Sequence, residues 1–122
     1  MSTRILLVED DDMCQEIVSE YAEDSGCTVD LASDGEQALL KISQHDYQLV
    51  LMDIMMPNMD GVEATRRIRA MEDATKSAVP IVAITARNPE LEQETWFAAG
   101  INSVISKPFE ETDLIRVLEQ YS

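Results

Sequence analysis

The chain has 122 residues, 45% of them apolar and 27% charged, which is typical of one globular domain. Its 9 basic and 24 acidic side chains give a formal net charge of −15, which disfavours direct binding to nucleic acids or anionic membranes because both need clustered Lys or Arg. The first residues form neither a signal peptide nor a membrane span, so we expect one cytoplasmic domain over residues 1–122.

In chain order, the apolar pattern predicts five strands, each followed by a helix. Short apolar runs predict strands, three of them buried on both faces: Ile5–Val8, 28–32, Gln48–Met52, Pro80–Ile84 and 103–105. Between these runs, apolar residues recur every three or four positions, which predicts helices. The residues expected to face the core are Met13, Ile17 and Tyr21 in the first helix, Ala38, Leu39 and Ile42 in the second, Ile68 and Met71 in the third, and Leu114, Ile115 and Leu118 in the last.

Residues between these elements support the same boundaries. Gly26 and Gly100 each stand where a helix needs a left-handed residue to end. Pro89 after Asn88 resembles a proline at the first helical position behind an N-cap. Because alternating strands and helices require right-handed crossovers, the chain is predicted to be a three-layer α/β sandwich of five βα units around a parallel sheet.

In such sheets, ligands bind outside the carboxyl ends of the strands. The acidic run 9–12 follows the first predicted strand, Asp53 the third, Thr85 the fourth, and Lys107 lies just after the fifth. Asp11 and Asp12 are interpreted as a solvated helix start. Glu9, Asp10 and Asp53 form an oxygen-rich, histidine-free set that favours Mg²⁺. A carboxylate nucleophile, a metal site, a hydroxyl and a lysine are the groups that phosphoryl transfer to a carboxylate requires.

The segment Leu49–Gly61 resembles the phosphorylation-site signature of the receiver domain of two-component response regulators, and the resemblance extends over the whole chain. It implies a (βα)5 flavodoxin-like fold with strand order 2-1-3-4-5. It also implies that a sensor histidine kinase or a histidine phosphotransfer protein donates a phosphoryl group to Asp53. The domain would catalyse only its own phosphorylation and slow dephosphorylation, so it is not expected to be an enzyme in the usual sense.

The resemblance also implies a role for each residue at the strand ends. The implied roles are phosphoryl acceptor for Asp53, switch hydroxyl for Thr85, phosphate contact for Lys107, and Mg²⁺ ligation for Glu9, Asp10, Asp53 and the Met55 backbone carbonyl. Phosphorylation would shift the loop after Thr85 and the helix that follows. Output would pass to a downstream protein, or to a domain outside this chain, and the face formed by the last helices and the last strand would serve any homodimer.

One position departs from the receiver pattern. Val104 stands where many receivers carry a rotating Tyr or Phe, so Thr85 has no aromatic partner at that position. We expect the signal to pass instead through residues 86–91 and the helix that carries Trp96 and Phe97. For Trp96 two interpretations stay open, a partner contact or a packing residue, with Phe97 and Ala98 available to fill the core.

Three other classes of protein are compared with this sequence at the positions that each class requires. A haloacid-dehalogenase-like phosphohydrolase needs a second Asp two residues after its nucleophile, where this chain has Met55. A flavodoxin needs a phosphate-binding loop where this chain has the acidic run 9–12. A non-phosphorylated adaptor of the receiver type remains open, although each expected site residue is present.

Arginine and cysteine positions receive simpler interpretations. Arg66, Arg67 and Arg69 are expected to form a solvated helix face. Cys14 and Cys27 have no metal-binding or disulfide spacing and are expected to be small packing residues.

Overall fold

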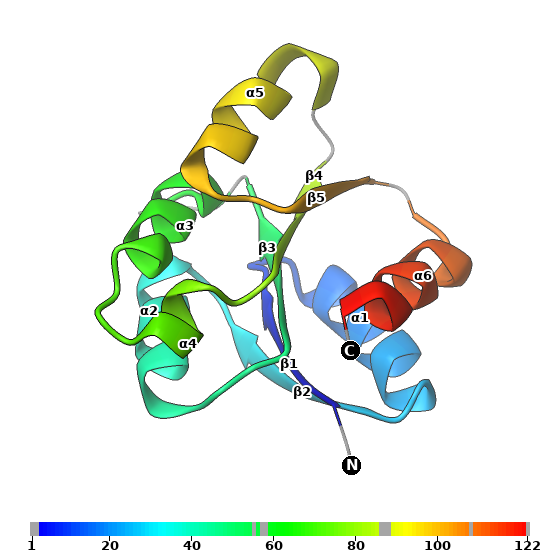
Figure 1. Cartoon of the computed structure of the whole chain (residues 1–122). Coiled ribbons are helices and arrows are strands. Elements are labelled where there is room, and N and C mark those ends of the chain that lie inside the picture. The colour runs from blue at the N-terminus through cyan, green and yellow to red at the C-terminus, as the bar shows by residue number, and fades with distance from the viewer. Residues whose placement is uncertain (1–2, 55, 57–58, 86–88, 108, 122) are drawn as a thin grey trace.

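The computed structural model describes residues 3–54, 56, 59–85, 89–107 and 109–121, with the backbone alone for 89–92. Its elements are β1 (Thr3–Val8), α1 (Asp12–Asp24), β2 (Cys27–Ala32), α2 (Gly35–Gln44), β3 (Leu49–Asp53), α3 (Gly61–Arg69), α4 (Ala74–Ser77), β4 (Ile81–Thr85), α5 (Pro89–Ala99), β5 (Ser103–Ser106) and α6 (Glu111–Tyr121). The five strands pair in parallel in the order β2-β1-β3-β4-β5 (Figure 1). The predicted strands and their order are therefore confirmed.

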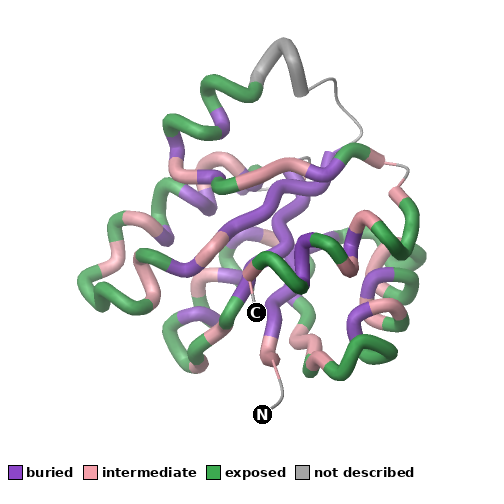
Figure 2. Tube along the Cα trace, turned by 45° about the vertical axis from the view of Figure 1, so that its right-hand side comes forward, coloured by how far each residue is buried: buried purple, intermediate pink, exposed green. Residues whose placement is uncertain are grey.

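The sheet lies between two helical layers, as Figure 1 shows. Alternate strand residues face opposite sides: Leu6 and Val50 join a core under α2, α3 and α5, whereas Ile5 and Leu49 join a second core under α1 and α6. The central strands are buried along their length, and they run through the middle of the molecule in Figure 2. The three-layer α/β sandwich is thus confirmed.

Helix α1 presents a different face to the sheet from the one predicted. Met13 and Ile17 are 70% and 42% exposed, whereas Val18 and Ala22 are fully buried. The inward stripe runs through Cys14, Val18 and Ala22, which are four residues apart. These smaller side chains let the helix pack close to the sheet, so the prediction that Met13 and Ile17 face the core was wrong.

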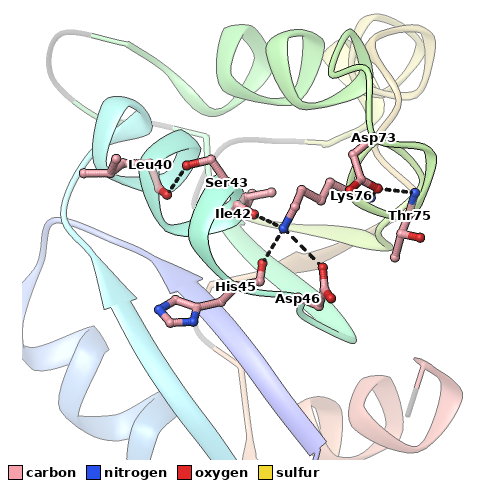
Figure 3. Close-up of polar contacts among 8 residues, drawn as sticks. All are labelled: Leu40, Ile42, Ser43, His45, Asp46, Asp73, Thr75 and Lys76. Carbon is pink, nitrogen blue, oxygen red and sulfur yellow. Dashed lines mark hydrogen bonds and ion pairs between the residues drawn. The ribbon is translucent and has the colours of Figure 1, made fainter.

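The short helix α4 between α3 and β4 was not predicted. The Asp73 side chain caps it by accepting hydrogen bonds from two backbone N–H groups. Lys76 of α4 reaches across to the end of α2, where its ammonium donates to the carbonyl oxygens of Ile42 at 2.6 Å and His45 at 3.1 Å and pairs with Asp46 at 3.2 Å (Figure 3). A cation at this place satisfies carbonyls that the end of an α-helix leaves without partners.

A second polar cluster lies at the amino edge of the sheet, where the parallel strands begin. Arg4 of β1 contacts Asp30 of β2, with Nε at 3.0 Å and Nη2 at 2.8 Å from Oδ2. The Tyr47 hydroxyl donates to the same oxygen at 2.7 Å, and the Tyr47 ring lies 5.8 Å from the Arg4 guanidinium. This cluster joins β1, β2 and the segment before β3.

Both ends of the described chain lie toward this amino edge. Thr3 begins β1, and the last turn of α6 lies beside it: one groove is lined by Thr3, by Cys27 of β2 and by Leu118 of α6. Within the described residues, none of the helices has the length and apolar character needed to cross a membrane.

Two glycines and two cysteines meet the expectations from sequence. Gly26 and Gly100 have φ angles of +88° and +114°, which confirms the predicted left-handed helix ends. Helix α5 begins at Pro89, as predicted, while its expected N-cap at residue 88 lies outside the described residues. Cys14 and Cys27 are free thiols packed against the core between the sheet and helices α1 and α6.

Candidate functional site

The polar residues predicted at the strand ends meet at the carboxyl edge of the sheet. Glu9 follows β1, Asp53 and Thr85 end β3 and β4, and Lys107 follows β5. The parallel register places Val8 beside Met52 and Asp53 beside Ile84, so the strands end nearly level. Glu9, Asp53 and Thr85 are buried, with exposed fractions of 1%, 4% and 0%.

Lys107 lies between the two buried acids. Its Nζ is 2.9 Å from Oε2 of Glu9 and 3.9 Å from Oδ2 of Asp53. The other oxygen of Glu9 accepts a hydrogen bond from the Asp11 N–H at 3.1 Å, and the Gln15 amide donates to the Glu9 backbone carbonyl at 2.5 Å. These contacts fix both the side chain and the backbone of Glu9.

The ionisation of this cluster follows from its contacts. Burial raises the pKa of Glu9, but hydrogen bonds with Lys107, Asp53 and the Asp11 backbone outweigh it, so the pKa lies below its usual range. Burial lowers the pKa of Lys107, but its hydrogen bond to Glu9 and the charge of Asp53 raise it above the usual value. The pair is therefore an ionised carboxylate and an ammonium. Burial, together with the nearby Glu9 charge, raises the pKa of Cys14 to about 12 and leaves it a neutral thiol.

Glu9, Asp10 and Asp53 can hold a metal ion together. One carboxylate oxygen from each lies within 4.8 Å of the others, and Asp10 faces solvent while the other two are buried. Three carboxylates suit a hard, oxygen-binding cation such as Mg²⁺, which keeps several waters and so needs an open side. The expected fourth ligand, the carbonyl of residue 55, lies outside the described residues.

Helix α3 begins against the backbone of Asp53. The Gly61 N–H donates to the Ile54 carbonyl at 3.1 Å, and a Cβ at Gly61 would lie 2.3 Å from the Asp53 carbonyl oxygen. Asp60 caps the helix by accepting from the Glu63 N–H at 2.8 Å. Sequence reasoning treated Gly61 only as part of a signature. The Asp-Gly pair at a helix start was the available signal for this close approach.

The aromatic residues of α5 differ from expectation. Trp96 is 2% exposed and belongs to the core under α2, α3 and α5, whereas Phe97 is 46% exposed. Of the two interpretations left open for Trp96, the structure supports the packing residue, and Phe97 and Ala98 are exposed and do not fill the core. Val104 is partly buried and packs against the same core as Trp96.

One arginine of α3 is not solvated as predicted. Arg66 and Arg67 are exposed, and Arg67 lies 3.7 Å from Glu63 one turn earlier. The Arg69 guanidinium instead donates to backbone carbonyls, including that of Gly100 at 2.7 Å. A helix-surface pattern does not reveal this, because the acceptors come from segments far along the chain.

Comparisons with known proteins agree with this geometry. Residues 5–119 match the response regulator receiver domain family. Transcription factor SKN7 of Saccharomyces cerevisiae is 38% identical over 117 residues, and the autoinducer 2 sensor kinase/phosphatase LuxQ of Vibrio vulnificus is 39% identical over 111 residues. The matches cover 96% and 91% of this chain, but only 18% and 13% of those proteins.

Solved structures give the same result. The receiver domain of sensor histidine kinase PA1611 from Pseudomonas aeruginosa, crystallised with magnesium in its active-site cleft, is 36% identical. It superposes with a TM-score of 0.90, covering 99% of this chain and 98% of that one. Chemotaxis protein CheY4 of Vibrio cholerae, 25% identical, gives a TM-score of 0.92 with both chains fully covered.

Proposed function

Because this chain belongs to the response regulator receiver domain family, we propose that it is a phosphorylation-activated switch whose phosphoryl acceptor is Asp53. The donor is the phosphohistidine of a sensor histidine kinase or of a histidine phosphotransfer protein. The domain spans residues 1–122 and acts in the cytoplasm. The observation that supports this most is the buried Asp53 carboxylate at the carboxyl edge, with a second acid and a lysine beside it.

In the proposed reaction, an oxygen of Asp53 attacks the phosphorus atom. A bond forms between that oxygen and phosphorus, the bond from phosphorus to the donor's histidine nitrogen breaks, and its electron pair stays on the nitrogen. Lys107 is close enough to both acids to move its ammonium from Glu9 toward the incoming phosphoryl oxygens. Thr85, fully buried at the end of β4, supplies a hydroxyl to the same group.

Glu9, Asp10 and Asp53 would hold the metal ion, together with the carbonyl of Met55. A bound Mg²⁺ supplies positive charge that offsets the repulsion between the acceptor carboxylate and the phosphoryl oxygens. Glu9 is shared in this scheme, because the same carboxylate contacts Lys107 and is one of the three candidate metal ligands. In the proposed reaction, Lys107 therefore leaves Glu9 for the phosphoryl group, while Glu9 would bind the metal ion.

In the phosphorylated state, a phosphoryl group with a charge of about −2 replaces the single negative charge of the Asp53 carboxylate next to Thr85. We propose that this charge changes the conformation of the loop after Thr85 and of α5, that water later hydrolyses the acyl phosphate slowly, and that the output passes to a protein partner or to a domain outside this chain. Val104 leaves no aromatic side chain at the position where many receivers have one, so the change passes through the backbone and α5.

The test is the intact mass of the protein after incubation with acetyl phosphate and Mg²⁺. We expect one added phosphoryl group in the wild type and none in Asp53→Asn or after chelation of the metal. Asp12→Asn, an exposed acid at the start of α1, is the matched control and should be phosphorylated normally. Failure of the wild type to accept phosphate from acetyl phosphate and from phosphohistidine donors alike, with its fold intact, would favour a non-phosphorylated adaptor.

A further inference from the structure

The Arg69 guanidinium lies where three segments of the chain meet. Its Nη1 donates to the carbonyls of Ser77 at 2.8 Å and Val79 at 2.7 Å, at the end of α4 and before β4. Its Nε and Nη2 donate to the Gly100 carbonyl, after α5, at 3.1 and 2.7 Å, and Nη2 also donates to the Asn102 side chain at 2.9 Å. A planar guanidinium can reach this many acceptors at once, whereas an ammonium cannot.

The turn after α5 is shaped around this side chain. Gly100 has a φ angle of +114°, and a Cβ there would lie 2.7 Å from both Cγ and Nε of Arg69. The same turn is tied to β4, because the Asn102 N–H donates to the Ile81 carbonyl at 2.8 Å and the Asn102 side chain accepts from the Ile81 N–H at 2.9 Å. The carboxyl end of α5 is therefore held to the start of β4.

The elements joined at Arg69 also carry the site at their other ends. Strand β4 begins near the Arg69 contacts and ends at Thr85, while β5 leads to Lys107. Helix α3, which ends at Arg69, begins at Gly61 against the Asp53 carbonyl. Helix α5 connects β4 to β5, so it begins on the side of the site and ends at the Arg69 contacts.

We propose that Arg69 is a positioning residue for the response of this domain: its guanidinium fixes the carboxyl end of α5, so that phosphorylation turns the helix about Gly100. This rests on the proposed function, since it concerns the movement that follows phosphorylation of Asp53. The amino-terminal turns of α5 move, while Gly100, Asn102 and the start of β5 keep their places. Loss of Arg69 lets the whole helix shift.

Trp96 gives this proposal an optical readout. It is the single tryptophan of the chain, is 2% exposed, and lies in the last turn of α5, where its carbonyl accepts from the Ile101 N–H at 3.1 Å. Because it is near the fixed end, its emission should change little when the wild type is phosphorylated. In Arg69→Gln the same step should change its emission severalfold more.

The direct test uses backbone amide chemical shifts, measured on the full chain with and without Mg²⁺ and a beryllium fluoride phosphoryl mimic. In the wild type, we expect the mimic to change the amide chemical shifts of residues 90–94 severalfold more than those of Gly100, Ile101 and Asn102. In Arg69→Gln the shifts should spread to these three residues. Equal shifts along α5 in the wild type, or an unchanged pattern in Arg69→Gln, would overturn the proposal.

Two further variants separate positioning from stability. Arg69→Lys keeps the charge and can donate to at most three acceptors, so its pattern should be intermediate and should stand in for Arg69→Gln if that variant does not fold. Arg66→Gln removes an exposed arginine from the same helix and should match the wild type. A lower melting temperature with the wild-type shift pattern would mean that Arg69 has only a structural role.

Phosphorylation is checked separately by the intact mass with acetyl phosphate. If neither acetyl phosphate nor a phosphohistidine donor phosphorylates Asp53, the proposed function fails, and the positioning role fails with it. If Asp53 is phosphorylated normally in the wild type and in Arg69→Gln while the shift pattern contradicts expectation, the positioning role alone is wrong.

Discussion

At the carboxyl edge of the sheet, three carboxylates lie together and Lys107 contacts two of them, whereas toward the amino edge Lys76 and Arg69 each contact several acceptors. One carboxylate oxygen each of Glu9, Asp10 and Asp53 lies within 4.8 Å of the others, and Lys107 contacts Glu9 at 2.9 Å and Asp53 at 3.9 Å. Toward the amino edge, Lys76 and Arg69 are surrounded by backbone carbonyls and neutral or acidic side chains.

This difference separates two uses of charge. At the amino edge, the described residues themselves supply the acceptors of Lys76 and Arg69, so these contacts join segments of the fold. At the carboxyl edge the acids repel one another, and a second cation would relieve that repulsion. The same sheet therefore has one edge where cations join segments of the fold and one edge where three acids gather at a candidate metal site.

The largest effect should come from filling the space between Gly61 and the backbone of Asp53. In Gly61→Ala the new Cβ would meet the Asp53 carbonyl, which is backbone and cannot rotate away. We expect the free energy of unfolding to fall by about 3 kcal/mol and phosphorylation of Asp53 to slow, as measured by urea unfolding and by intact mass.

Gly35→Ala is the matched control. The three atoms nearest its Cβ would all belong to the Met59 side chain, the nearest being Sδ at 2.8 Å. The cost there should be about 1 kcal/mol, with normal phosphorylation. Equal costs at the two glycines would contradict the idea that the Asp53 backbone fixes the start of α3.

A smaller effect should follow the loss of Lys107. Lys107→Met leaves the buried Glu9 carboxylate without its cation. In the absence of divalent metal, the free energy of unfolding should therefore fall by about 2 kcal/mol, which is less than for a fully buried pair because Lys107 is partly exposed. Mg²⁺ should then stabilise the variant more than the wild type, since Lys107 no longer competes for Glu9.

Urea unfolding with and without Mg²⁺ measures both the free energy of unfolding without metal and its increase when Mg²⁺ is added. Lys41→Met, on α2, removes a lysine outside the described contacts of the site and should show the wild-type response to Mg²⁺. If Mg²⁺ stabilises Lys107→Met and the wild type equally, Lys107 and the metal do not share Glu9.

The smallest effect concerns the amino edge and depends on pH. Burial raises the pKa of Asp30, but hydrogen bonds from Tyr47 and Arg4 outweigh it and hold the pKa below its usual value. A lowered folded-state pKa stabilises the protein above the unfolded value of about 4, and this stabilisation is lost as the pH falls through the folded pKa. The stability difference between wild type and Asp30→Asn should therefore shrink below about pH 4.

The measurement is urea unfolding at a series of pH values. Asp24→Asn, which removes an exposed acid at the end of α1, is the control and should show a smaller dependence on pH. A difference between wild type and Asp30→Asn that stays constant down to the acid limit would mean that the Arg4 and Tyr47 contacts do not favour the charged form.

Much of the fold could be predicted because its signals are local. Buried parallel strands are short continuous apolar runs, so Ile5–Val8 and its counterparts were found within one or two residues. The topology brought Glu9, Asp53, Thr85 and Lys107 to one edge, and the structure places them there.

What could not be predicted depends on contacts between distant residues. The inward face of α1 is set by the small side chains that fit the sheet, which periodicity alone did not identify when it selected Met13 and Ile17. The acceptors of Arg69 lie up to 33 residues away along the chain, so the spacing of residues within the helix could not predict that Arg69 is partly buried. Trp96 and Phe97 are adjacent on α5, and only packing decides which of them is buried.

The positions of the two chain ends have a consequence for modularity. Thr3 and the last turn of α6 lie together at the amino edge, away from the acids and Lys107. A polypeptide joined to either end would therefore start on that side of the molecule, at the opposite edge of the sheet from the acids and Lys107. The same unit can therefore be inserted into longer proteins of different design, and its relatives range from a transcription factor to a sensor kinase.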